Sequence, residues 1–313
     1  MKRPLTLGGK SHSRPGWVDE DLYPFRDNWI TVDGSVVHYV DEGPRDAPVL
    51  LFVHPGAGWS FTYRYHIRQL KRDFRCVAPD LPGYGLSEAR TGYGYTLMEQ
   101  AAILGQFVKS LNLQRIVAWA NDGGGPTIVL GLAHHTERIL GLVVGGTFGW
   151  SIKPYRGVVW PLRLFTSRVF RFLNRYTNLL GSLMGSKSAL GTRSLSKAER
   201  EHYTMPFKER STRNRTLKLY SSFLDRTVQG ALDEALPAFR EKPVLIQFGE
   251  RDAMTGQHWP ERWAKEFPNS RCNILPHVGH FTFEGGPEAT VENFRSWWAD
   301  ARSFAFNEVR ANH

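Results

Sequence analysis

Short apolar runs alternate with amphipathic segments along much of the chain. Residues 49–53 form a continuous apolar run of the kind that is buried on both faces of a parallel sheet. Helices are predicted near residues 61–71 and at 96–111, and an amphipathic helix at 287–298. Because strands that alternate with helices at short spacing are joined by crossovers, this pattern predicts a mostly parallel sheet flanked by helices. The other predicted strands are 30–32, 36–40, 75–78, 115–119, 140–144, 243–248 and 273–275.

The alternation stops after Thr147 and resumes at Pro243. The sequence between them is helical, basic and aromatic, and contains no clear strand. An insertion at this point would cover the ends of the parallel strands, where a sheet of this kind binds its ligand. We therefore predict a core domain of residues 1–147 and 237–313 and a helical lid of residues 148–236.

A single carboxylate stands at the junction between a predicted strand and a predicted helix. Residues 117–125 read Val-Ala-Trp-Ala-Asn-Asp-Gly-Gly-Gly, with small residues two positions before and after Asp122. This is the spacing of a nucleophile elbow, in which the chain turns so sharply that Ala120 and Gly124 must leave room. A carboxylate nucleophile suits attack on a saturated carbon, since attack on an acyl group would give a reactive anhydride. The alternative is that Asp122 only caps the following helix.

Two later segments supply the partners that an Asp nucleophile requires. Asp252 ends a polar turn after the predicted strand 243–248, and His280 follows the predicted strand 273–275. The chain order nucleophile, acid, histidine is that of α/β-hydrolases. His280 can accept a proton from water, and Asp252 can orient its imidazole. Each residue taken singly has a structural alternative: Asp252 could lie in a solvated turn, and His280 could be a hydrogen-bonded histidine of the core.

From about residue 29 to 298 the chain resembles the haloalkane dehalogenase and epoxide hydrolase branch of the α/β-hydrolase superfamily. Residues 52–64 are similar to the dehalogenase loop His-Gly-x-Pro-Thr-Trp-Ser, and residues 77–87 match Pro-Asp-x-x-Gly-x-Gly-x-Ser. Residues 199–207 resemble a dehalogenase lid motif. The resemblance implies an α/β-hydrolase fold with an eight-stranded, mostly parallel sheet, a helical lid, and a triad of Asp122, Asp252 and His280.

Two departures from the family fall where dehalogenases usually hold the leaving halide. Dehalogenases use a Trp directly after the nucleophile and often an Asn in the His-Gly-x loop, and this chain has Gly123 and Gly56 there. The N–H groups of both glycines would still form an oxyanion hole, although Pro55 has no N–H to give. We also expect the two glycines to widen the pocket floor for a branched or bulky group.

Aromatic residues of the lid and its surroundings are the expected substrate contacts. Epoxide hydrolases use lid tyrosines to protonate the epoxide oxygen, and Tyr155, Tyr176, Tyr203 and Tyr220 are available, although tyrosines among aromatics commonly pack. The predicted substrate-binding residues are Trp59, Trp150, Tyr155, Tyr203 and Phe207.

The net charge of +10 is concentrated in one segment. Between Ser151 and Arg215 there are fourteen Lys and Arg and three Glu, a net of +11, so the rest of the chain is near −1. Arginines alternate there with large apolar residues, which predicts either a surface for an anionic membrane or a lid helix with a solvated arginine face. We expect no nucleic-acid partner, because no recognised nucleic-acid motif accompanies the charge. The alternating arginines are Arg163, Arg168, Arg171 and Arg175.

The chain predicts a cytoplasmic protein. Residues 1–18 lack the apolar stretch of a signal peptide, and no apolar run approaches about 18 residues. Cys76 and Cys272 fall on predicted interior strands far apart in the sheet, so we expect no disulfide.

These patterns together predict a hydrolase without cofactor or metal that acts on a small substrate with an apolar chain. Asp122 would attack a saturated carbon, as in a haloalkane dehalogenase, and His280 would activate the water that cleaves the resulting ester. An epoxide hydrolase or a β-lactone-acting enzyme is the alternative within the same class. A binding protein on a hydrolase scaffold is the alternative outside it, and the oligomeric state is left open.

Overall fold

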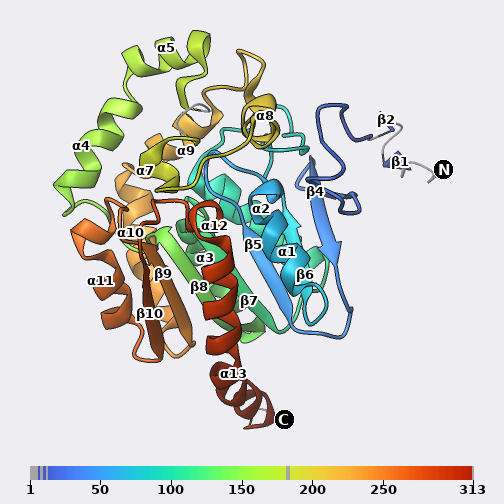
Figure 1. Ribbon diagram of the computed structural model, residues 1–313, viewed down its shortest axis with the longest axis vertical. Helices are drawn as coiled ribbons and strands as arrows, with labels where there is room; N and C mark the ends of the chain where they lie inside the picture. Colours follow the sequence, from blue (N-terminus) through green and yellow to red (C-terminus); the bar gives the residue numbers. More distant parts are fainter. Residues whose placement is uncertain (1–5, 8–9, 12, 181–183, 312–313) are drawn as a thin grey trace.

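The computed structural model describes residues 6–7, 10–11, 13–180 and 184–311, and an eight-stranded sheet forms its centre (Figure 1). The strand order is β10-β9-β8-β7-β5-β6-β4-β3, with antiparallel pairing only at β3–β4 and β4–β6. The predicted eight-stranded, mostly parallel sheet is thus confirmed. The strands are β3 (Asn28–Val32), β4 (Ser35–Glu42), β5 (Val49–Val53), β6 (Arg75–Pro79), β7 (Ile116–Asp122), β8 (Ile139–Thr147), β9 (Val244–Gly249) and β10 (Ser270–Leu275). A separate two-stranded antiparallel sheet consists of β1 (Thr6–Leu7) and β2 (Lys10–Ser11).

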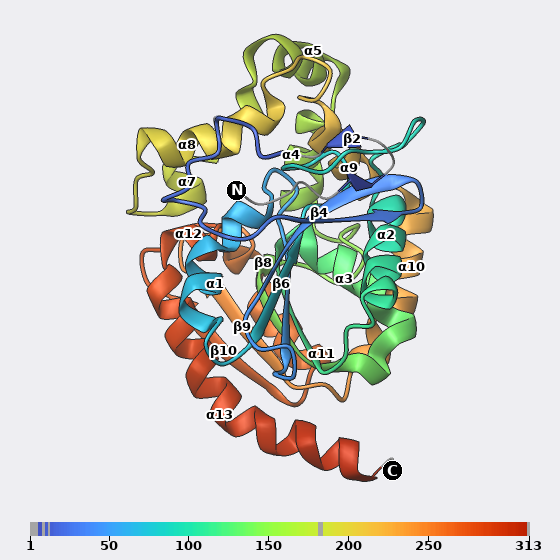
Figure 2. The same cartoon turned by 90° about the vertical axis from the view of Figure 1, so that its right-hand side faces the viewer.

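Helices cover both faces of the sheet (Figure 2). One face packs against α1 and α13, and the other against α2, α3, α10 and α11. Side chains along β5 alternate between the two cores, with Val49, Leu51 and Val53 in one and Leu50 and Phe52 in the other. This double burial explains the continuous apolar run. The flanking helices are α1 (Arg64–Leu70), α2 (Leu97–Ser110), α3 (Gly124–Leu132), α10 (Arg226–Ala235), α11 (Trp259–Glu266) and α13 (Pro287–Ala311), and the short helices beside them are η1 (Ser60–Tyr63), η2 (Ala133–Arg138), η4 (Leu236–Phe239), η5 (Thr255–Gln257) and α12 (Thr282–Gly285).

Several local sequence signals have the structures they predict. Asp33 and Gly34 both have positive φ, at 44° and 72°, and form the turn between β3 and β4. Thr96 and Glu99 form a capping box at the start of α2. The β3–β4 turn and the start of α2 are therefore set by residues whose local conformation or side-chain hydrogen bonds favour them.

The segment between β8 and β9 is helical, as expected, and its helices α4 to α9 gather at one end of the sheet (Figure 1). α10 follows them and packs against α3 on the face of the sheet. The limits 148–236 for a lid domain stay a prediction. The lid helices are α4 (Arg156–Phe165), α5 (Arg168–Thr177), α7 (Lys187–Leu190), α8 (Lys197–Thr204), η3 (Met205–Phe207) and α9 (Arg215–Ser222).

The two cysteines lie on well separated strands, β6 and β10. Cys76 is buried, whereas Cys272 is exposed and free, because β10 is an edge strand; the prediction that both occupy interior strands was wrong for Cys272. Among the described residues, no helix is both long and apolar enough to cross a membrane.

Candidate active site

Asp122 ends β7 in a left-handed backbone conformation, with φ at +48°. A non-glycine residue is strained there, and such strain is a feature of functional turns. A Cβ atom on Gly124 would lie 2.5 Å from the carbonyl oxygen of Val53, so a side chain at this position would clash with β5. The capping alternative was wrong, because the N-cap residue of α3 is Gly123 and no side chain caps the helix.

The loops after β9 and β10 bring Asp252 and His280 to the end of β7. His280 Nδ1 lies 3.1 Å from Asp252 Oδ2, and His280 Nε2 lies 3.7 Å from Asp122 Oδ1. The backbone N–H of Met254 donates to the other Asp252 oxygen at 3.0 Å and holds that carboxylate in place. The structure therefore places the three residues of the predicted triad side by side, with His280 between the two carboxylates.

The charges of this group are strongly coupled. Burial alone would lower the pKa of His280, but Asp252 and Asp122 outweigh it and raise the pKa to about 10. Burial would raise the pKa of Asp122, yet His280, Tyr220 and the Gly123 N–H together hold it below its usual value. At neutral pH the site thus holds the His280 imidazolium beside the Asp122 carboxylate.

The two oxygens of the Asp122 carboxylate have different surroundings. The backbone N–H of Gly56 donates to Oδ2 at 2.9 Å, and the hydroxyl of Tyr220 donates to the same oxygen at 2.7 Å. Oδ1 instead faces His280. The predicted oxyanion donor Gly56 therefore points at Asp122, and Oδ1 is the oxygen left to react.

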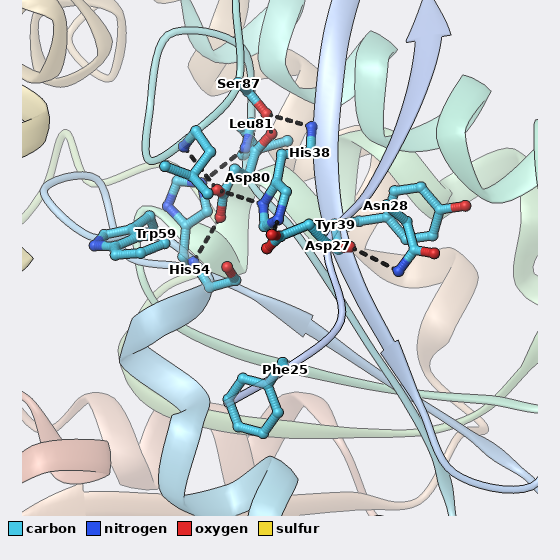
Figure 3. Close-up of polar contacts among 12 residues, drawn as sticks. Phe25, Asp27, Asn28, His38, Tyr39, His54, Trp59, Asp80, Leu81 and Ser87 are labelled. Carbon is cyan, nitrogen blue, oxygen red and sulfur yellow. Dashed lines mark hydrogen bonds and ion pairs between the residues drawn. The ribbon is translucent and has the colours of Figure 1, made fainter. Parts of the chain in front are cut away.

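His54 holds the peptide that presents the Gly56 N–H. Leu81 donates its backbone N–H to His54 Nε2 at 3.0 Å, which leaves Nδ1 protonated to donate to the Pro55 carbonyl at 2.8 Å (Figure 3). The Pro55 carbonyl and the Gly56 N–H belong to one peptide group and point in opposite directions. Burial lowers the pKa of His54, so the neutral ring keeps this arrangement.

Tyr220 occupies the space that the two glycines leave. A Cβ atom on Gly56 would lie 2.7 Å from the Tyr220 ring, so an asparagine at this position would displace the ring. Beside Gly123, Leu219 and Phe223 of the same lid segment stand 3.5 and 3.4 Å from where a Cβ would be. The expectation of a wider pocket floor was therefore wrong, because α9 and the residue after it fill the floor.

Tyr220 is the residue that sequence reasoning placed only among four lid tyrosines. Its local pattern does not distinguish it from Tyr176 or Tyr203, since all three lie on helices among other aromatics. Gly56 is the sequence signal that points to Tyr220. Gly56 lacks the side-chain donor that dehalogenases often have there, so another residue must supply a donor beside the nucleophile. Burial and the neighbouring Asp122 raise the pKa of Tyr220, so its hydroxyl stays protonated.

Three of the predicted substrate contacts are engaged in packing. Trp59 is buried, and its indole N–H donates to the His202 carbonyl at 2.8 Å. The ring centroid of Trp150 lies 5.0 Å from that of Trp263 in α11, and the guanidinium of Arg262 lies over the Trp150 ring. Arg262 also donates to the hydroxyl of Tyr155 at 3.1 Å. These contacts do not support a role at the reaction centre, and the assignment of these three residues stays a prediction.

The other two have different surroundings. The hydroxyl of Tyr203 donates to Glu284 at 2.5 Å, within a buried group of charges between α8 and the core. Phe207 lines a small recess with Ala57 and Thr216, and Thr216 donates to the carbonyl of Gly56 at 2.6 Å. Of the five, Phe207 therefore lies on the oxyanion side of the site.

Asn121 is a positioning residue that sequence reasoning missed. Its amide nitrogen donates to the His280 carbonyl at 3.0 Å, and its amide oxygen accepts from Thr282 Oγ1 at 3.0 Å. The residue before the nucleophile thereby fixes the loop that carries the histidine. Where side chains are described, no group of three or more His, Cys, Asp or Glu is placed to hold a metal ion.

Known proteins are similar to this chain in fold and in sequence. A family model for the α/β hydrolase fold matches residues 48–287. The chain is 31% identical over 284 residues to haloalkane dehalogenase 2 of Mycobacterium tuberculosis, covering 88% of this chain and 97% of the relative. It is 29% identical over 300 residues to the cis-3-alkyl-4-alkyloxetan-2-one decarboxylase of Shewanella oneidensis, covering 91% and 92%. The crystal structure of haloalkane dehalogenase DbeA from Bradyrhizobium elkani matches with a TM-score of 0.80 at 24% identity, over 89% of this chain and 99% of that chain.

The fold, the elbow and the family match together define the class: the chain belongs to the α/β hydrolase fold family. Within that family it is a haloalkane dehalogenase-like α/β hydrolase. It is therefore an enzyme, and not the non-catalytic binding protein that the sequence left open.

Proposed function

We propose that Asp122 is a nucleophile whose Oδ1 attacks a saturated carbon and forms an alkyl-enzyme ester. The different contacts of its two carboxylate oxygens support this role. Gly56 and Tyr220 hold Oδ2 at 2.9 and 2.7 Å, while Oδ1 has His280 Nε2 at 3.7 Å. Donors fixed on Oδ2 stabilise the charge that develops there when the ester is cleaved.

His280 then activates the water that cleaves the ester. Before attack, the carboxylate of Asp122 is one of the charges that raise the pKa of His280 to about 10. Once that carboxylate is an uncharged ester, this contribution is lost and the pKa of His280 falls, so the imidazole can release its proton and act as a base. Asp252 at 3.1 Å stabilises the imidazolium that forms when water is deprotonated.

The leaving group that the geometry supports best is the ring oxygen of a β-lactone, an oxetan-2-one. Both positions that hold halide in dehalogenases are glycines, and Tyr220, Leu219 and Phe223 fill the space beside them. A lactone oxygen leaves as a carboxylate within the same molecule, so it requires neither a halide site nor a proton donor. A relative at 29% identity carries alkyl-substituted oxetan-2-one in its name.

The proposed steps balance without a cofactor. Asp122 Oδ1 bonds to the ring carbon that carries oxygen, and that carbon–oxygen bond breaks with its electron pair on the new substrate carboxylate. Water then adds to the carbonyl carbon of the ester while His280 takes its proton. The bond between that carbon and the alkyl oxygen breaks, His280 returns the proton to this oxygen, and the product leaves as a 3-hydroxy acid with Asp122 again a carboxylic acid that ionises to the carboxylate. Leu219 and Phe223 are buried apolar side chains beside Gly123, the residue after the nucleophile, and such neighbours suit a substrate with alkyl chains.

Intact-protein mass spectrometry of His280→Gln protein tests the proposal directly, since the ester should form and persist. A lactone or an epoxide adds its whole mass to Asp122, whereas a haloalkane adds its mass less the hydrogen halide. We expect a whole-mass adduct from dialkyl β-lactones, and none in a His280→Gln, Asp122→Ala double variant. An adduct from 1-bromoalkanes alone would assign haloalkanes instead.

We also propose that the lid makes peripheral contact with an anionic membrane. The charge excess of +11 lies between Ser151 and Arg215, and this stretch supplies the exposed helices α4 and α5. Such contact would bring the enzyme to substrates with apolar chains.

A further inference from the structure

The exposed apolar side chains of this protein are concentrated on one helical hairpin. Nine large hydrophobic side chains are exposed among the described residues, and six of them belong to α4 and α5. Only Met98 and Ile274 lie outside the stretch 160–179. We name as the hairpin surface the six residues Trp160, Leu164, Val169, Phe172, Leu173 and Tyr176.

α5 turns its apolar face outward and its polar face inward. Val169, Phe172, Leu173 and Tyr176 follow the spacing i, i+3, i+4, i+7, which puts them on one face, and all four are exposed. Asn174, on the opposite side, is buried and donates to the Arg213 carbonyl at 2.8 Å. An ordinary lid helix would show the reverse arrangement. The alternative in which the helix packs its apolar face on the core is therefore wrong for α5, although its arginines Arg168 and Arg175 are exposed.

Cations flank the hairpin surface, and the two helices that carry it contain no acidic residue. The sequence has no Asp or Glu between Glu137 and Glu199. The guanidinium of Arg163 lies 5.4 Å from the Trp160 ring centroid, and that of Arg210 lies 5.0 Å from the Tyr176 ring. The exposed arginines of the hairpin are Arg156, Arg163, Arg168 and Arg175.

We infer that the hairpin surface docks on an anionic lipid bilayer, a step that deepens the peripheral contact proposed above. Arginines that flank exposed Trp, Phe and Leu are the composition of helices that lie in a membrane interface, where apolar side chains enter the acyl region and guanidinium groups stay among the phosphates. α5 lies at the extreme end of the molecule, opposite the C-terminal end of α13, so a flat surface can meet it (Figures 1 and 2).

The hairpin is one helix away from the reaction centre. α4 packs against α9, and the guanidinium of Arg171 donates to the hydroxyl of Ser221. Tyr220, the next residue, contacts Asp122. A docked hairpin would therefore hold the lid side of the site close to the bilayer, where substrates with alkyl chains concentrate.

Flotation with phosphatidylglycerol-rich and pure phosphatidylcholine vesicles tests the inference with two variants. The first replaces Arg156, Arg163, Arg168 and Arg175 by Gln, and the second carries Phe172→Ser and Leu173→Ser. We expect the parent to bind the anionic vesicles at low salt and to lose binding as salt is added. Each arginine removed should lower the partition coefficient about fivefold, and the second variant should lose most binding.

Matched controls replace the same chemistry elsewhere. Met98→Ser with Ile274→Ser removes two exposed apolar side chains from other faces, and Gln at Arg45, Arg72, Arg240 and Arg271 removes four charges. Both controls should bind like the parent. Equal binding by parent and hairpin variants, or no binding to anionic vesicles at low salt, would overturn the inference.

A second copy of the chain is the competing occupant. If light scattering shows a dimer that Phe172→Ser with Leu173→Ser dissociates, while vesicle binding is absent, the surface is a self-association interface and the inference fails. Asp122→Ala protein should bind vesicles like the parent. Vesicle binding therefore stands or falls separately from the proposed reaction.

Discussion

The two ends of the lid are attached to the rest of the molecule in opposite ways. At α8, buried charges join lid and core: Arg64 of α1 donates to Glu199 at 2.7 Å and also to Glu284, and Arg193 donates to the same two carboxylates. At α5, the side that faces the molecule is polar and the apolar side is exposed. One end of the lid is thus fixed to the loop after His280, and the other is free to meet a surface.

This difference shows that the cations of the lid fall into two groups, those paired with carboxylates at the core and those exposed at the surface. Arg193 shares with Arg64 the neutralisation of two carboxylates, whereas Arg163 and Arg168 have exposed side chains beside apolar ones. Net charge alone does not separate these groups. Burial and partner do, and they lead to different expectations for substitutions at the two ends.

The largest effect on stability is expected at the α8 end of the lid, where buried charges join it to the core. Glu284→Ala leaves Arg64, which is almost fully buried, without its main carboxylate, and removing one partner of a buried pair costs about 3–5 kcal/mol of unfolding free energy. Because α12 follows His280 directly, turnover should fall as well. Urea unfolding measures the stability. The control is Glu201→Ala in α8, whose ion pair with Lys197 is exposed and should contribute less than about 1 kcal/mol.

Tyr220→Phe should slow turnover without loss of stability. The ring that fills the space beside Gly56 is kept, and only the donor to Asp122 Oδ2 is removed. Loss of one donor to a developing oxyanion costs on the order of 3 kcal/mol, roughly a hundredfold in rate. Single-turnover kinetics should show ester accumulation, because cleavage of the ester is the step affected. Tyr176→Phe, at an exposed lid tyrosine, is the control, and equal rates for both variants would contradict the proposed role of the hydroxyl.

Stability should depend on pH through a buried histidine of the core. Burial would lower the pKa of His38, but Asp80 and Asp27 outweigh it and raise the pKa to about 8 (Figure 3). The folded pKa exceeds the unfolded value of about 6.5, so the stabilisation is complete below pH 6.5 and is lost as pH rises through 8. The loss is about 2 kcal/mol. Because the pKa of His280 is also raised, urea unfolding from pH 6 to 9 is measured in a His280→Gln background, and adding His38→Gln should flatten the profile that remains.

The smallest effect is expected at the free end. Phe172→Ser with Leu173→Ser changes only exposed side chains, so the free energy of unfolding should stay within about 0.5 kcal/mol of the parent. Turnover of a water-soluble substrate should also be unchanged. Thermal unfolding and a vesicle-free assay check both. A clear destabilisation would mean that these side chains pack against the lid after all, and the contrast between its two ends would disappear.

The local chemistry of the chain was enough to predict much of this architecture. A continuous apolar run such as residues 49–53 favours a strand covered on both faces, and β5, β7, β8 and β9 are fully buried strands of this kind. The small residues around Asp122 are required by backbone atoms within a few ångströms, so the elbow is visible in the local sequence. The order of Asp122, Asp252 and His280 along the chain likewise reflects the order of strands in the sheet.

Only the folded chain shows which lid side chains meet the core. Tyr203 and Tyr220 are alike in sequence context, yet one donates to Glu284 and the other to Asp122. The amphipathic pattern of α5 is compatible with its apolar face inward or outward. In the structure this face is outward, and the inward side bonds to the rest of the lid, as Asn174 does to the Arg213 carbonyl. Periodicity depends on neighbours three and four residues apart, whereas these choices depend on contacts between segments distant in sequence, such as Tyr220 with Gly56.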